Sequence, residues 1–111
     1  MLEGKKHWLF HRLSAILLLP LIIWCIWSLS LIPKISYDNM VLWAGNTINF
    51  IFLCALIIVS AYHFQLGIQV IFEDYISNVA KRNLFIKVIH VLFYILCMLG
   101  LFSLIVIYFG V

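Results

Sequence analysis

The segment INFIFLCALIIVSAYHFQLGIQVIF, residues 48–72, decides the fold of this 111-residue chain. It contains no Asp, Glu, Lys or Arg, and about 20 consecutive apolar residues are enough for a helix to cross a bilayer. We therefore predict a transmembrane helix over these residues. Two further stretches free of the same charged residues predict two more spans, over residues 13–33 and 88–109.

The composition supports a membrane location. Hydrophobic residues make up 67% of the chain and charged residues only 10%, which leaves too little polar surface to coat a soluble globule. We predict an all-α integral membrane bundle of three transmembrane helices, forming a single membrane domain over residues 1–111. Residues 37–46 are predicted as an interfacial turn, and Pro20 is expected to bend the first helix.

The distribution of positive charge predicts the orientation. Most basic residues lie before the first span or between the second and third spans: Lys5, Lys6, Arg12, Lys81, Arg82 and Lys87. By the positive-inside rule, the N-terminus and the second loop face the cytoplasm or, in a mitochondrion, the matrix. This topology accounts for the net charge of +3, so the charge does not indicate nucleic-acid binding.

His63 is an ionisable residue near the middle of the second span. Such groups usually face a partner, a cofactor or water, because exposing them to hydrocarbon is costly. On a helical wheel His63 shares a stripe with Gly67 and Asp74, and the missing side chain of Gly67 lets a broad, flat group approach the backbone. The pattern fits a porphyrin bound through the imidazole. It also fits an interhelical hydrogen bond beside a close helix contact.

The other histidines and the cysteines give weaker signals. His90 lies about three residues into the third span, roughly 9 Å shallower than His63, which disfavours binding of one iron by both. His7 and His11 form an H-x3-H pair, which we interpret as interfacial polar residues because a zinc ion needs further ligands. The three cysteines fall one in each span and are expected to behave as small hydrophobes: Cys25, Cys54 and Cys97.

Two segments resemble a known family. The spacing His63-x3-Gly67-x6-Asp74-Tyr75 is similar to that in the second transmembrane helix of the hydrophobic membrane-anchor subunit of succinate dehydrogenase, respiratory complex II, also described as the small subunit of its cytochrome b. The segment HWLFHRLSA, residues 7–15, resembles the basic and aromatic stretch that leads into the first span of that family. Three spans in a chain of this size agree with the resemblance along nearly its whole length.

The resemblance implies a role for four residues. His63 would supply one axial ligand to the iron of a haem b shared with a sister anchor subunit, and Arg12 would lie near the haem propionates and the quinone pocket. Tyr75 would hydrogen-bond a ubiquinone carbonyl, with the carboxylate of Asp74 beside it. The implied partners are the sister anchor subunit, an iron–sulfur subunit and a flavoprotein subunit. The complex would lie in a bacterial cytoplasmic membrane or the mitochondrial inner membrane.

Under this interpretation the chain is not catalytic alone. It has no flavin motif and no cysteine set for an iron–sulfur cluster, so electrons must come from a docked partner. One alternative is a haem-free structural anchor of a related complex. A small proton-coupled transporter is a weaker alternative, because such transporters depend on a carboxylate within a span and all four acidic residues lie outside the predicted spans.

Overall fold

The computed structural model describes residues 4–110, which form four helices. They are α1 (Gly4–Ser30), α2 (Tyr37–Gly45), α3 (Thr47–Tyr75) and α4 (Val79–Phe109). Helices α1, α3 and α4 are long and apolar enough to cross a membrane. The predictions of an all-α class and of three membrane-crossing helices are therefore confirmed, while the orientation in the membrane stays a prediction.

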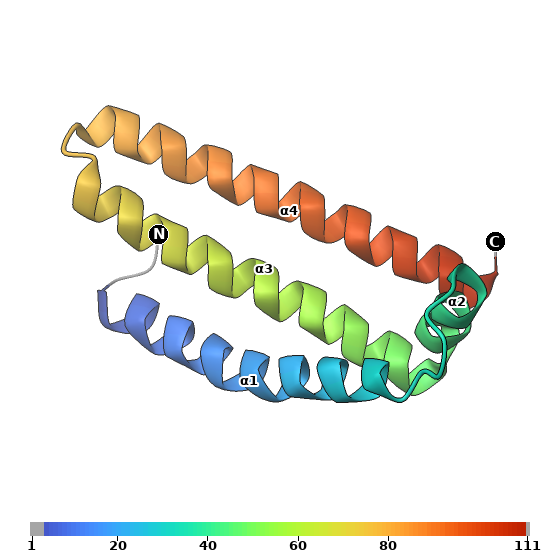
Figure 1. Ribbon diagram of the computed structural model, residues 1–111. Helices are drawn as coiled ribbons and strands as arrows, with labels where there is room; N and C mark the ends of the chain where they lie inside the picture. The colour runs from blue at the N-terminus through green and yellow to red at the C-terminus, as the bar shows by residue number, and fades with distance from the viewer. Residues whose placement is uncertain (1–3, 111) are drawn as a thin grey trace.

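Helix α3 lies between α1 and α4 (Figure 1). Within the described residues α1 and α4 each pack on α3, and their backbones do not approach one another. The short helix α2 crosses the end of the bundle and packs on α3 and α4. Helix α3 consequently has two separate packed faces, one toward α1 and one toward α4.

The helices extend beyond the charge-free windows at the end of the bundle where α3 meets α4. Helix α4 begins at Val79 instead of residue 88, so the basic residues predicted to lie in a loop belong to its first turns. Asn78 caps this helix by accepting a hydrogen bond from the backbone N–H of Lys81 at 3.0 Å. The link between α3 and α4 is reduced to residues 76–78. Hydropathy marked the hydrocarbon-crossing part, whereas helical hydrogen bonding continues past it.

Residues 37–45 form a helix, so the prediction of an interfacial turn was wrong for this segment. Ser36 supplies an N-cap, since its hydroxyl accepts a hydrogen bond from the backbone N–H of Asn39 at 3.2 Å. Gly45 ends this helix, and Asn46 separates it from α3. Asn46 then caps α3 through its side-chain oxygen.

Hydrogen bonds tie α2 to its neighbours. The indole N–H of Trp43 donates to Ser28 Oγ at 2.7 Å, and the side-chain amide of Asn49 donates to the Trp43 carbonyl at 2.9 Å. Helix α2 thereby joins the end of α1 to the start of α3.

The first span remains one continuous helix. Helix α1 runs through Pro20 without a break, and its axis changes direction along its length in Figure 1. Few side chains in the bundle are fully enclosed, and large apolar residues cover the outside of α1, α3 and α4. In a bilayer such surfaces face lipid or other polypeptides.

Candidate functional site

His63 lies on the face of α3 that packs against α1. Its Nδ1 atom is 2.9 Å from Ser14 Oγ, and its ring centroid is 4.5 Å from that of His11, with the ring planes tilted by 30°. The imidazole is half-buried. It therefore faces polar groups of α1.

His11 of α1 lies beside Gly67 at an ordinary van der Waals distance. A Cβ atom at Gly67 would lie 3.5 Å from His11 Nε2, so the flat group that approaches this point within the chain is the His11 imidazole. The expectation that a porphyrin would lie here is not tested by the structure. What the structure adds is that His11 reaches the same turn of α3.

The chemistry of His63 fits an axial ligand. Its hydrogen bond to Ser14 uses Nδ1, and no described residue hydrogen-bonds Nε2. Histidines that bind a metal through one ring nitrogen generally hydrogen-bond a protein group through the other nitrogen. Among the described residues His63 is the one imidazole at mid-span, so the chain can supply one protein ligand to a haem iron at that depth.

A cavity of about 480 Å³ with several polar side chains in its lining lies between the first turns of α1 and the last turns of α3. His7, His11, Gly67 and Glu73 are among the residues that line it. The His7 side chain is 8% exposed, and its Nε2 atom has no hydrogen-bond partner in the described residues. His7 and His11 share one face of α1, with ring centroids 6.3 Å apart. The cavity adjoins the site of His63 through His11 and Gly67.

Arg12 follows His11 on α1 but does not line the cavity. Its side chain is exposed, with the guanidinium carbon 5.5 Å from the centre of the Trp8 ring. That distance is within the range of a cation–π interaction. The guanidinium is therefore accessible from outside the chain.

Asp74 and Tyr75 are the last two residues of α3. Both are exposed, Tyr75 to 84%, and neither side chain makes a hydrogen bond within the described residues. Because α3 continues through Tyr75, twelve residues separate it from His63, or about 18 Å along the helix axis. The structure thus brings His63 together with Ser14 and His11, and keeps Asp74 and Tyr75 at another depth.

His90 lies against the opposite packed face of α3. Its Nε2 atom is 3.2 Å from Gln69 Oε1, and the Gln69 amide donates to Glu73 Oε1 at 2.9 Å. Gln69 is six residues from His63, about 9 Å along α3. His90 and His63 therefore lie at different depths, as expected. They also lie on different sides of α3, since His63 faces α1 and His90 contacts the face toward α4.

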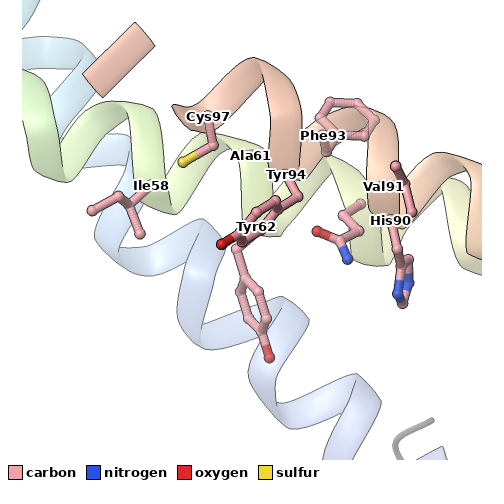
Figure 2. Close-up of a pocket in the computed structure, with 9 residues that line it drawn as sticks. Ile58, Ala61, Tyr62, His90, Val91, Phe93, Tyr94 and Cys97 are labelled. Atoms are coloured by element: carbon pink, nitrogen blue, oxygen red, sulfur yellow. The ribbon is translucent and has the colours of Figure 1, made fainter. Parts of the chain in front are cut away.

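An open, mostly apolar cavity of about 460 Å³ lies beside His90, between α3 and α4. Figure 2 shows Tyr62 of α3 and Tyr94 and Cys97 of α4 around it. All three cysteines of the chain are free thiols, one in each long helix.

Comparison with known proteins identifies the family. Residues 3–97 match the family described as the succinate dehydrogenase/fumarate reductase transmembrane subunit. The chain belongs to this family.

Three relatives show how far the similarity extends. The succinate dehydrogenase hydrophobic membrane anchor subunit of Rickettsia bellii is 40% identical over 82 residues, which are 73% of this chain and 65% of the relative. That of Rickettsia prowazekii is 29% identical over 105 residues, covering 94% of this chain and 80% of the relative. The succinate dehydrogenase membrane anchor subunit of Reclinomonas americana is 30% identical over 93 residues, which are 81% of this chain and 78% of the relative. The chain thus spans just under two thirds of the Rickettsia bellii relative, and no solved structure gives a significant match.

Two residues of this anchor subunit were not predicted from the sequence. Ser14 was not singled out, although it is a polar residue in an apolar segment, three residues after His11. Gln69 lies off the helical stripe of His63 and was likewise not singled out, yet it is 4% exposed and its side-chain oxygen contacts His90. A polar residue within a span was the available signal in both cases.

Proposed function

We propose that this anchor subunit binds the catalytic part of succinate dehydrogenase to the membrane and forms half of a haem b site and part of a ubiquinone site. The N-terminus and the α3–α4 link face the cytoplasm or matrix. The proposal extends the family membership, since the family is one of cytochrome b subunits. Its partners are the sister anchor subunit, the iron–sulfur subunit and the flavoprotein subunit.

One observation carries the haem part of the proposal. His63 is held through Nδ1 by Ser14, which leaves Nε2 to coordinate an iron. The second axial ligand comes from the sister anchor subunit, because His90 differs from His63 in depth and in face. A haem bound there would supply a one-electron redox centre.

The ubiquinone part rests on the end of α3. The phenol of Tyr75 is exposed and makes no hydrogen bond within the described residues, so it can donate one to a quinone carbonyl. A donor at that oxygen stabilises the negative charge that develops there on reduction. Asp74 lies beside Tyr75, and the exposed Arg12 contributes positive potential from α1.

Electrons reach this site from outside the chain. The sequence offers neither a flavin motif nor a cysteine set for a cluster, and its three cysteines are separate thiols in different helices. The docked iron–sulfur subunit therefore delivers them, after the flavoprotein has taken them from succinate. The anchor subunit positions the acceptor and does not itself oxidise succinate.

A haem-free anchor is the second candidate function. It is favoured by the contacts of His63 within the chain, where Ser14 hydrogen-bonds the ring and His11 packs on it. These contacts give the imidazole a hydrogen-bond partner at Nδ1 and a packing partner without a cofactor. The two functions differ in one measurable property, the b-type absorbance of the purified complex.

The first prediction separates them. His63→Ala is expected to abolish or shift the b-type band in the dithionite-reduced minus oxidised spectrum of the complex, because the iron loses a ligand. His90→Gln keeps a donor toward Gln69 and is expected to retain the band. A wild-type complex without a b-type band would establish the haem-free anchor, whereas an unchanged band in His63→Ala would show that His63 does not bind the haem.

The subunit composition tests the anchoring part separately. Purification through a tag on this chain is expected to yield a flavoprotein, an iron–sulfur protein and a second hydrophobic subunit in equal amounts. Recovery of the chain without a flavoprotein and an iron–sulfur protein would contradict the proposal.

A further inference from the structure

Ser14 lies where α1 faces His63 and is one of the most buried polar residues, at 4% exposed. Its hydroxyl makes two short contacts, one of 2.7 Å to the backbone carbonyl of His11 and one of 2.9 Å to His63 Nδ1. The first contact lies within α1 and the second crosses to α3. Within residues 4–110, Ser14 therefore makes the one hydrogen bond between these two helices at the depth of His63.

The direction of both hydrogen bonds follows from counting protons. A serine hydroxyl carries one hydrogen, and a backbone carbonyl can only accept. The contact of 2.7 Å between two oxygen atoms requires that hydrogen, so Ser14 donates to His11. With its hydrogen used, the Ser14 oxygen can only accept from His63, and Nδ1 must carry the proton.

A neutral imidazole has one N–H and one lone pair. If Nδ1 of His63 is protonated, the lone pair is on Nε2. We propose that Ser14 is a positioning residue that fixes His63 in the tautomer with Nε2 free to bind a metal, and so tunes the haem iron. This inference rests on the proposed function of His63 as an axial ligand.

His90 shows that the chain does not impose this tautomer on every membrane histidine. The Gln69 amide nitrogen donates to the carboxylate of Glu73, which fixes the amide orientation and leaves Gln69 Oε1 facing His90. Since this oxygen can only accept, His90 carries its proton on Nε2. The two intramembrane histidines therefore hold opposite tautomers, and only that of His63 leaves Nε2 free.

The bond to Ser14 also affects the electronic character of the imidazole. An N–H that donates to an acceptor makes the other ring nitrogen more basic and fixes the ring orientation. A more basic ligand stabilises the oxidised iron over the reduced iron. Loss of the Ser14 oxygen is therefore expected to raise the haem midpoint potential and to weaken haem retention, the latter by roughly tenfold.

The experiment uses the intact purified complex with Ser14→Ala, Ser14→Thr and, as a matched control, Ser103→Ala. Ser103 is also a helical serine that donates to a carbonyl of its own helix, but it is exposed on α4. The readouts are the midpoint potential from redox titration and the rate of haem loss to apomyoglobin. Ser14→Ala is expected to raise the midpoint potential and the rate of haem loss. Ser14→Thr keeps the hydroxyl and is expected to have wild-type values. Ser103→Ala is expected to change neither the potential nor the rate.

A second variant covers a failure of Ser14→Ala to assemble. Ser14→Cys keeps the side-chain size but offers a weak acceptor, so its potential is expected to rise in the same direction. The role of Ser14 would be overturned if Ser14→Ala had the midpoint potential and haem retention of the wild type. If only Ser14→Cys assembles, the same result in that variant would overturn it. In that case His63→Ala would still remove the haem, so the proposed function would stand. A wild-type complex without haem would overturn both.

Discussion

His63 illustrates what a single residue in a span reveals. Its position in an apolar segment predicted that it has a polar partner or a cofactor, and the structure places Ser14 and His11 beside it. Helical periodicity gave the stripe that His63 shares with Gly67. It could not give the residue opposite that stripe, because this depends on how α1 packs on α3, and that contact is not encoded by any local spacing.

Tyr75 carries the second prediction at this scale. Tyr75→Phe is expected to lower succinate–quinone reductase activity, through a KM for quinone raised roughly tenfold, while haem content and assembly stay near wild type. The reason is that the variant removes one hydrogen-bond donor, worth about 1 kcal/mol or more, and little else. Steady-state kinetics with a soluble quinone and the reduced-minus-oxidised spectrum check it.

The matched control is Tyr37→Phe. Tyr37 is 82% exposed, close to the value for Tyr75, but it lies in α2 at the other end of the bundle (Figure 1). Equal kinetics for wild type, Tyr75→Phe and Tyr37→Phe would rule out the assignment of Tyr75 to the quinone site.

At the scale of the helices, α3 and α4 are held together by a buried polar contact and by an Ile57 side chain that packs on the backbone at Gly100. Gln69 joins His90 to Glu73, and a Cβ atom at Gly100 would lie 3.2 Å from Ile57 Cδ1. The first contact is near the Tyr75 end of the pair and the second is farther along α4. Together they fix how the helix that ends in Tyr75 lies against its neighbour.

Gln69→Leu is therefore expected to destabilise the α3–α4 pair. The change leaves the His90 N–H without its acceptor, at a cost of about 1–3 kcal/mol. Gln65→Leu is the matched control, because Gln65 lies one turn earlier on α3 and makes no side-chain hydrogen bond within the described residues. The measurement is thermal unfolding of the complex in detergent, monitored through the dissociation of its subunits. The transition should start at a lower temperature in Gln69→Leu but not in Gln65→Leu. Identical transitions in the two variants would show that the contact contributes nothing to stability.

The ends of the helices could not be predicted from hydropathy. Hydropathy located each span because hydrocarbon excludes charge, but it placed the start of the third helix at residue 88 and missed the turns that carry Lys81, Arg82 and Lys87. Those turns belong to the helix because Asn78 caps it, accepting a hydrogen bond from the backbone N–H of Lys81. Hydropathy does not register an N-cap such as Ser36, so residues 37–45 were predicted as a turn although they form α2.

For the molecule as a whole, the class and the number of spans could be predicted from the sequence, whereas the order of packing could not. That α3 is central follows from contacts between distant segments. Basic residues gather at the end of the bundle with the α3–α4 link, and this distribution is the basis of the predicted orientation.

The orientation can be measured with single cysteines. In a chain whose three native cysteines are replaced by Ala, Ser77→Cys in the α3–α4 link should react with a membrane-impermeant thiol reagent only from the cytoplasmic or matrix side. Lys34→Cys, between α1 and α2, should react only from the opposite side. The reverse pattern in inverted and right-side-out vesicles would show that the bundle is inserted the other way round.

The three-residue link between α3 and α4 has a consequence for biogenesis. These two helices can pair as soon as both have left the ribosome, whereas the Ser14–His63 contact joins residues 49 positions apart and forms only when α1 docks. Until α1 docks, the His63 imidazole on α3 lacks its Ser14 partner. The packing of α1 on α3 is thus the assembly step that orients this ring.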